Sequence, residues 1–87
     1  MSGDVIRVLL ADDHAVVRAG LKAVLGGAKD IAVVGEAGNG REAVDAALRL
    51  NPDVVVMDLS MDEMDGVAAT RELKSRASAS RVLILTM

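Results

Sequence analysis

The segment 51–60, Asn-Pro-Asp-Val-Val-Val-Met-Asp-Leu-Ser, constrains the fold more than any other part of the sequence. Pro52 cannot donate a main-chain hydrogen bond and disfavours helix in the residue before it, so it ends the preceding element. The apolar run 54–57 is mostly β-branched and too short for a buried helix, which predicts a strand buried on both faces. Asp58 then lies where a buried parallel strand reaches the surface. Ligands of open α/β sheets bind at the carboxyl ends of such strands.

Composition limits the class of protein. A length of 87 residues makes one small domain, and 52% hydrophobic content is typical of a globular chain. The absence of Phe, Tyr and Trp means that the core must be aliphatic, and with a net charge of −3 it argues against a general nucleic-acid surface. The absence of cysteine excludes a disulfide framework and a thiolate metal site. We find no signal-peptide pattern and no span of membrane length, so we expect a cytoplasmic protein without membrane contact.

Apolar strand patterns alternate with helical patterns along the chain. We expect strands at 5–11, 31–37, the central run ending at Asp58, and 81–87, with helices at 14–25, 41–50 and 67–76. The first helix should pack through Val17, Leu21, Val24 and Leu25. This β-α-β-α-β-α-β order predicts a parallel sheet with right-handed crossovers and helices on both faces.

The predicted topology gathers polar residues at one edge of the sheet. Asp12 and Asp13 follow the first strand, Asp58 ends the third, and Thr86 lies at the end of the fourth. If the first and third strands are neighbours, the three acids converge at a topological switch point. Three carboxylates repel one another unless a cation joins them, so we expect an oxygen-ligand site for Mg²⁺. Asp58 beside such a metal is a candidate nucleophile that would form an aspartyl-phosphate, with the Thr86 hydroxyl bonding a phosphoryl oxygen.

Four motifs occur in the right order on the right elements for one known family. They are Leu-Leu-Ala-Asp-Asp-His at 9–14, Val-Val-Met-Asp-Leu-Ser at 55–60, Met-Asp-Gly at 64–66 and Leu-Ile-Leu-Thr-Met at 83–87. Together they resemble the receiver domain of bacterial two-component response regulators. The Asp-Asp-His triplet followed by Val-Arg-Ala-Gly-Leu at 17–21 is similar to the NarL/FixJ (LuxR-type) subfamily. The resemblance covers essentially the whole chain, residues 1–87.

The resemblance implies a flavodoxin-like (CheY-like) doubly wound parallel sheet with strand order 2-1-3-4-5. It implies a phosphorelay in which a partner sensor histidine kinase phosphorylates one aspartate and the regulator switches conformation to control transcription. By position, Asp58 would be the phospho-acceptor and Thr86 the switch hydroxyl. Asp12, Asp13, Asp58 and the main-chain carbonyl of Ser60 would bind Mg²⁺. Such a domain is no enzyme beyond its own autocatalytic phosphorylation.

The sequence departs from the family pattern at two places. Asp62 stands where the family usually has proline. The sequence stops after the expected fourth strand, so the fifth strand with its phosphoryl-pairing lysine, two helices and any DNA-binding effector domain would be absent. We therefore expect phosphorylation of these residues to be slow, down to undetectable, while metal binding survives. The apolar strand 81–87 should form an open edge and favour self-association, and DNA binding would need the absent domain.

Several alternatives remain open on the sequence alone. The chain could be a receiver-like fragment that does not switch and acts only in assembly or protein interaction, or a metal-dependent hydrolase with no positioned general base besides the acids themselves. Asp12 and Asp13 could merely cap a helix, Asp58 could be a surface acid, and Thr86 could be an ordinary strand residue. We expect His14 to be solvated and assign it no role. The glycine spacing at 35–40 does not fit a dinucleotide loop and predicts a turn.

Overall fold

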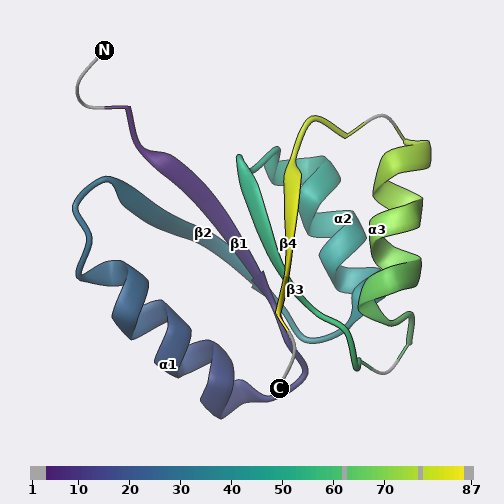
Figure 1. Ribbon diagram of the computed structural model, residues 1–87, viewed down its shortest axis with the longest axis horizontal. Coiled ribbons are helices and arrows are strands. Elements are labelled where there is room, and N and C mark those ends of the chain that lie inside the picture. The colour runs from purple at the N-terminus through teal and green to yellow at the C-terminus, as the bar shows by residue number, and fades with distance from the viewer. Residues whose placement is uncertain (1–3, 62, 77, 86–87) are drawn as a thin grey trace.

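A four-stranded parallel sheet organises the computed structural model, which describes residues 4–61, 63–76 and 78–85 (Figure 1). The strands are β1 (Ile6–Ala11), β2 (Ile31–Ala37), β3 (Val54–Asp58) and β4 (Arg81–Leu85), in the spatial order β2-β1-β3-β4. The helices α1 (Ala15–Gly26), α2 (Gly40–Leu50) and α3 (Gly66–Ser75) connect consecutive strands. The flavodoxin-like α/β prediction is confirmed, with element ends displaced by at most two residues where the structure describes them. Residues 86 and 87 of the predicted fourth strand lie outside the described residues.

Helices cover both faces of the sheet. Figure 1 shows α1 on one side and α2 with α3 on the other, and both α1 and α2 contact β1 and β2. The side chains of β1 alternate accordingly: Leu9 and Ala11 join the core cluster beneath α2, while Val8 and Leu10 are buried outside that cluster. Because both faces of β1 are buried at these positions, each position needs an apolar side chain, which explains the continuous apolar run. None of the helices in the described part of the chain is long and apolar enough to span a membrane.

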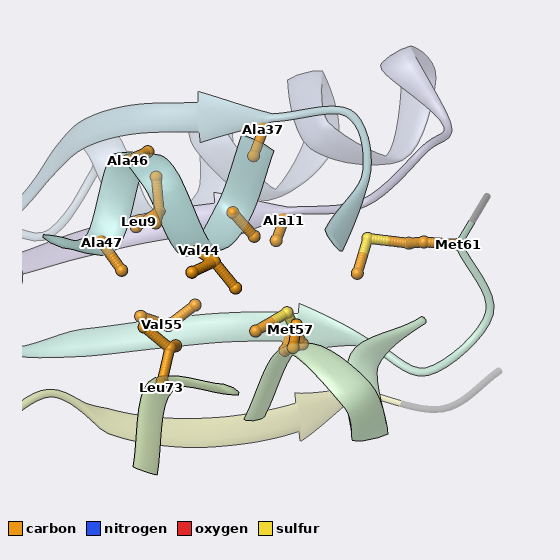
Figure 2. Packing of buried hydrophobic residues seen from close by; sticks show 12 residues of the cluster. Leu9, Ala11, Ala37, Val44, Ala46, Ala47, Val55, Met57, Met61 and Leu73 are labelled. Carbon is orange, nitrogen blue, oxygen red and sulfur yellow. The ribbon is translucent and has the colours of Figure 1, made fainter. Parts of the chain in front are cut away.

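The main core lies between α2, α3 and the sheet. Figure 2 shows Val44 pointing from α2 towards Val55 and Met57 of β3. All three side chains are fully buried, and Leu73 of α3 lies in the same cluster. The core is built from aliphatic side chains and methionine, as the composition predicts.

The predicted packing stripe of α1 is partly wrong. Val17, Leu21 and Leu25 are half-buried, but Val24 is 74% exposed, and no residue of α1 is fully buried. A line through residues 17, 21 and 25 faces the sheet, and Val24 lies to one side of that line in the last turn. Helical spacing alone could not place this residue, because the apolar positions of α1 extend around more of the helix than the sheet covers.

The register of β1 against β3 brings the carboxyl ends of these two strands, and the aspartates located there, close together. Val8 pairs with Val54 and Ala11 pairs with Met57, so β1 and β3 end side by side at the same edge of the sheet. Asp12 follows Ala11 directly and Asp58 is the last residue of β3. Neighbouring parallel strands thus deliver both aspartates to one end of the sheet, as expected at a topological switch point.

Candidate functional site

Two buried carboxylates mark the carboxyl end of the central strands. Asp12 is 3% exposed and Asp58 is 7% exposed. Burial of a charged carboxylate is unfavourable unless partners or a cation compensate for the lost hydration. Each acid accepts a hydrogen bond from a main-chain amide two residues later, His14 to Asp12 at 2.8 Å and Ser60 to Asp58 at 3.3 Å. These amides satisfy one oxygen of each side chain and leave capacity for a further ligand.

Asp13 and His14 complete a compact cluster with the two buried acids. One potential ligand atom from each of Asp12, Asp13, His14 and Asp58 lies within 4.8 Å of the others. The structure therefore brings together the three acids that the topology predicted to converge. Neither Asp12 nor Asp13 is the N-cap residue of α1, which is His14 without a side-chain capping bond. Simple helix capping does not account for the pair.

His14, which we expected to be solvated and to which we assigned no role, also belongs to this cluster. Its side chain is 67% exposed, and Nδ1 lies 3.1 Å from Asp12 Oδ1 and 2.8 Å from Asp13 Oδ1. The hydrogen bond to Asp12 and then the charge of Asp13 raise the pKa of His14 above its ordinary value of 6.5. The sequence contained a signal for the contact between His14 and Asp12. An aspartate commonly accepts a hydrogen bond from the main-chain amide two residues later, which turns that later residue towards the aspartate.

The β3–α3 loop is closed tightly over the end of β3. The amide of Gly66 donates to the carbonyl of Leu59 at 3.1 Å, and Gly66 is buried against the main-chain oxygen of Asp58, where a Cβ would collide. Asp65 caps α3 by accepting a hydrogen bond from the amide of Ala68 at 2.9 Å. The Met-Asp-Gly motif at 64–66 therefore forms the capped start of α3. Its glycine lies directly against Asp58, the candidate phospho-acceptor.

A shallow depression opens beside the acids. It is lined by Asp13, His14, Leu59, Ser60, Met61 and Asp65. Ser60 is exposed within it, so a ligand seated here would lie between the ends of β1 and β3. The role of the Ser60 carbonyl as a metal ligand remains a prediction. Thr86, the predicted switch hydroxyl, and Asp62 both lie outside the described residues.

The donor set suits a hard divalent cation. Three carboxylates from Asp12, Asp13 and Asp58 supply oxygen ligands and a formal charge of about −3, which matches the preference of Mg²⁺ for a few carboxylates plus carbonyl and water ligands. His14 is the one nitrogen donor of the cluster, and Mg²⁺ prefers oxygen. The residues present therefore fit Mg²⁺ held by the aspartates, with His14 at the rim.

Comparisons with known proteins agree on one family for this chain. A family model for the response regulator receiver domain matches residues 8–87. The chain is 49% identical over 81 residues to the transcriptional regulatory protein LiaR of Bacillus subtilis, an alignment that covers 93% of this chain and 38% of LiaR. The chain thus spans well under half the length of this curated relative.

Solved structures agree in fold. The signal receiver domain of the response regulator NarL from Mycobacterium tuberculosis matches with a TM-score of 0.92 and 32% identity, covering 95% of this chain and 67% of that one. RcsB from Salmonella enterica serovar Typhimurium, solved on the promoter rprA in the presence of the phosphomimetic BeF3⁻, matches with a TM-score of 0.87 and 28% identity. That match covers 97% of this chain and 43% of the RcsB chain.

Proposed function

Because the chain belongs to the response regulator receiver domain family, we propose that it accepts a phosphoryl group on Asp58 from a partner histidine kinase in the cytoplasm. The observation that carries this proposal is the burial of Asp58 at the end of β3 with its carboxylate in the cluster formed with Asp12 and Asp13. The proposed phosphorylation changes the conformation of the receiver and, where a receiver is joined to an effector domain, thereby controls transcription. RcsB, which is structurally similar, was captured on a promoter with a phosphomimetic, and this supports the same type of output.

The chemistry proposed for Asp58 is an in-line phosphoryl transfer. One carboxylate oxygen of Asp58 attacks phosphorus, the bond between phosphorus and the donor atom breaks, and an aspartyl-phosphate results. The donor group leaves with the electron pair of the broken bond. Mg²⁺, when bound by Asp12, Asp13, Asp58 and the Ser60 carbonyl, would offset the negative charge on the transferring oxygens. The amide of Ser60 already holds one oxygen of Asp58 and so orients the nucleophile.

The test uses a small-molecule phosphodonor, such as acetyl phosphate, with intact-mass detection. We expect slow, Mg²⁺-dependent addition of one phosphoryl group to the wild type, none with Asp58→Asn, and none with excess chelator. Asp45→Asn is the matched control, because Asp45 is 68% exposed on α2 and pairs only loosely with Arg41 at 3.9 Å. Phosphorylation of Asp58→Asn to the wild-type extent would contradict the proposal.

A second function rests on the outer edge of the sheet. Among the described residues β4 pairs with β3 alone, and Leu83 and Ile84 of β4 are 56% and 39% exposed. Unpaired apolar edges template pairing with another chain. We therefore also propose that the 87-residue chain self-associates through β4. Mg²⁺ binding without any phosphorylation would favour this assembly role over the switching role for the isolated chain.

A further inference from the structure

Arg18 of α1 connects the ends of two strands behind the acidic cluster. Its Nη1 donates to the main-chain oxygen of Asp12 at 2.5 Å, and its Nε donates to Oε1 of Glu36 at 3.2 Å. The Arg18 side chain is only 21% exposed, so the guanidinium is held in place by its surroundings. Because Asp12 follows β1 and Glu36 lies near the end of β2, one side chain fixes both strand ends relative to α1.

The main chain at Asp12 is thereby held from two sides. The Asp12 amide donates to the carbonyl of Ala37 on β2 at 3.1 Å, and the Asp12 carbonyl accepts from Arg18. The Asp12 side chain in turn accepts from the amide of His14 at 2.8 Å. These bonds fix the peptide from which the carboxylates of Asp12 and Asp13 project towards Asp58.

The position of the Arg18 charge matters as much as its hydrogen bonds. Arg18 contacts the main-chain oxygen of Asp12 and leaves the Asp12 carboxylate to the amide and ring of His14. The charge of Arg18 is instead balanced by Glu36, which also accepts from Nζ of Lys22 at 3.3 Å. A cation placed directly on the carboxylates would compete with a divalent ion for them. Arg18 supports the aspartates without taking up their oxygens.

We propose that Arg18 is a positioning residue for the metal site, acting through the main chain of Asp12 and held in place by Glu36. This inference rests on the proposed Mg²⁺-dependent function and identifies which residue outside the ligand set keeps the site in order. Partners that orient metal ligands from outside the ligand set commonly change metal affinity about 10- to 100-fold when they are mutated.

Lys22 provides the matched control. It lies on the same helix, carries the same charge and binds the same acid, Glu36, but its described hydrogen bond does not reach Asp12. Arg18→Met and Lys22→Met each remove one cation and one bond to Glu36. Only Arg18→Met also removes the bond to the Asp12 carbonyl.

The experiment measures Mg²⁺ affinity by titration calorimetry and hydrogen exchange at the amide of His14. We expect Arg18→Met to weaken Mg²⁺ binding about tenfold or more and to speed His14 exchange, while Lys22→Met changes neither. Arg18→Lys keeps the charge but loses the planar fork, so its affinity should fall between those of the wild type and Arg18→Met. Glu36→Gln should weaken binding in the same direction, because it releases Arg18.

The outcomes separate the inference from the function on which it rests. Failure of the wild type to bind Mg²⁺ would overturn the proposed function. Binding by the wild type with unchanged affinity and His14 exchange in Arg18→Met would overturn the positioning role alone, as would an equal loss in Lys22→Met. If Arg18→Met does not fold, as judged by circular dichroism, the same two measurements are made on Arg18→Lys and Glu36→Gln. Wild-type Mg²⁺ affinity and wild-type His14 exchange in both of these variants would refute the inference.

Discussion

Gly40→Ala tests how the β3–α3 loop is anchored to α2. Gly40 is buried at the start of α2, and a Cβ there would collide with the main-chain oxygen of Met64 and lie 2.9 Å from the Met64 Cβ. Met64 and its neighbour Glu63 have φ values of 83° and 50°, in the left-handed region that non-glycine residues rarely adopt. The amide of Arg41 donates to the carbonyl of Glu63 at 3.2 Å. The loop therefore rests on the first turn of α2.

The magnitude follows from two opposed terms. Alanine is a better helix residue than glycine by up to about 1 kcal/mol, which alone would stabilise α2. The colliding atom belongs to the main chain, so it cannot rotate away, and overpacking of this kind costs about 1–3 kcal/mol. We expect Gly40→Ala to lower the free energy of unfolding by about 1–2 kcal/mol, the collision outweighing the gain in propensity. Gly20→Ala in α1 is the control, since a Cβ at Gly20 meets no atom within 4 Å.

Urea unfolding monitored by circular dichroism measures both variants. Gly20→Ala should raise the free energy of unfolding by about 0.5–1 kcal/mol, because it gains helix propensity without a collision. Gly40→Ala can also be measured in the Gly20→Ala background if it is too unstable alone. The reasoning is refuted if Gly40→Ala is as stable as Gly20→Ala, because the loop would then move aside at no cost.

Three further predictions concern the acids, the histidine and the sheet edge. Asp13→Asn should weaken Mg²⁺ binding about tenfold or more, because the site loses one charged ligand, and titration calorimetry measures this loss. The same substitution should stabilise the metal-free chain at high pH by relieving repulsion among the carboxylates, which urea unfolding checks. Because the pKa of His14 is raised, its pairing with Asp12 and Asp13 stabilises the fold below the unfolded pKa of about 6.5 and is lost as pH rises through the folded pKa. The stability of the wild type relative to His14→Asn should therefore fall between about pH 5.5 and about pH 8.5, because the effect of Asn as an N-cap is the same at both pH values; an unchanged difference would contradict the assignment. Leu83→Lys should make the chain monomeric in sedimentation at micromolar concentration, whereas a monodisperse wild-type monomer would refute association through β4.

The topology was predictable because several independent sequence signals agree. The first strand is nearly continuous in apolar residues, which requires burial on both faces, and α1 and α2 both contact it. The run 54–57 was expected to be buried on both faces, but only Val55 and Met57 are buried, while Val54 and Val56 on the other face are half-buried. Gly26 and Pro52 mark ends that the structure keeps within a residue or two. Once the strands are parallel and alternate with helices, few windings remain, so the meeting of Asp12 with Asp58 follows from topology alone.

The details around the site were not predictable, because they depend on contacts between segments distant in the sequence. Nothing in the helical pattern of α1 indicates that Arg18 reaches back to the carbonyl of Asp12 and across to Glu36. The left-handed conformations of Glu63 and Met64 likewise occur where the loop packs on the first turn of α2, with Met64 against Gly40 and the Glu63 carbonyl bonded to the amide of Arg41. Local preference would have placed glycine or asparagine at such positions, and here tertiary packing prevails over it.

The most direct test of the central claim locates the phosphoryl group chemically. An aspartyl-phosphate is an acyl phosphate, so borohydride reduction converts the modified aspartate to homoserine and marks its position for peptide mass spectrometry. After incubation with acetyl phosphate and Mg²⁺, the account predicts homoserine at position 58 alone, and none when the metal is chelated. Homoserine at position 12, 13 or 65 with Asp58 unmodified would contradict it.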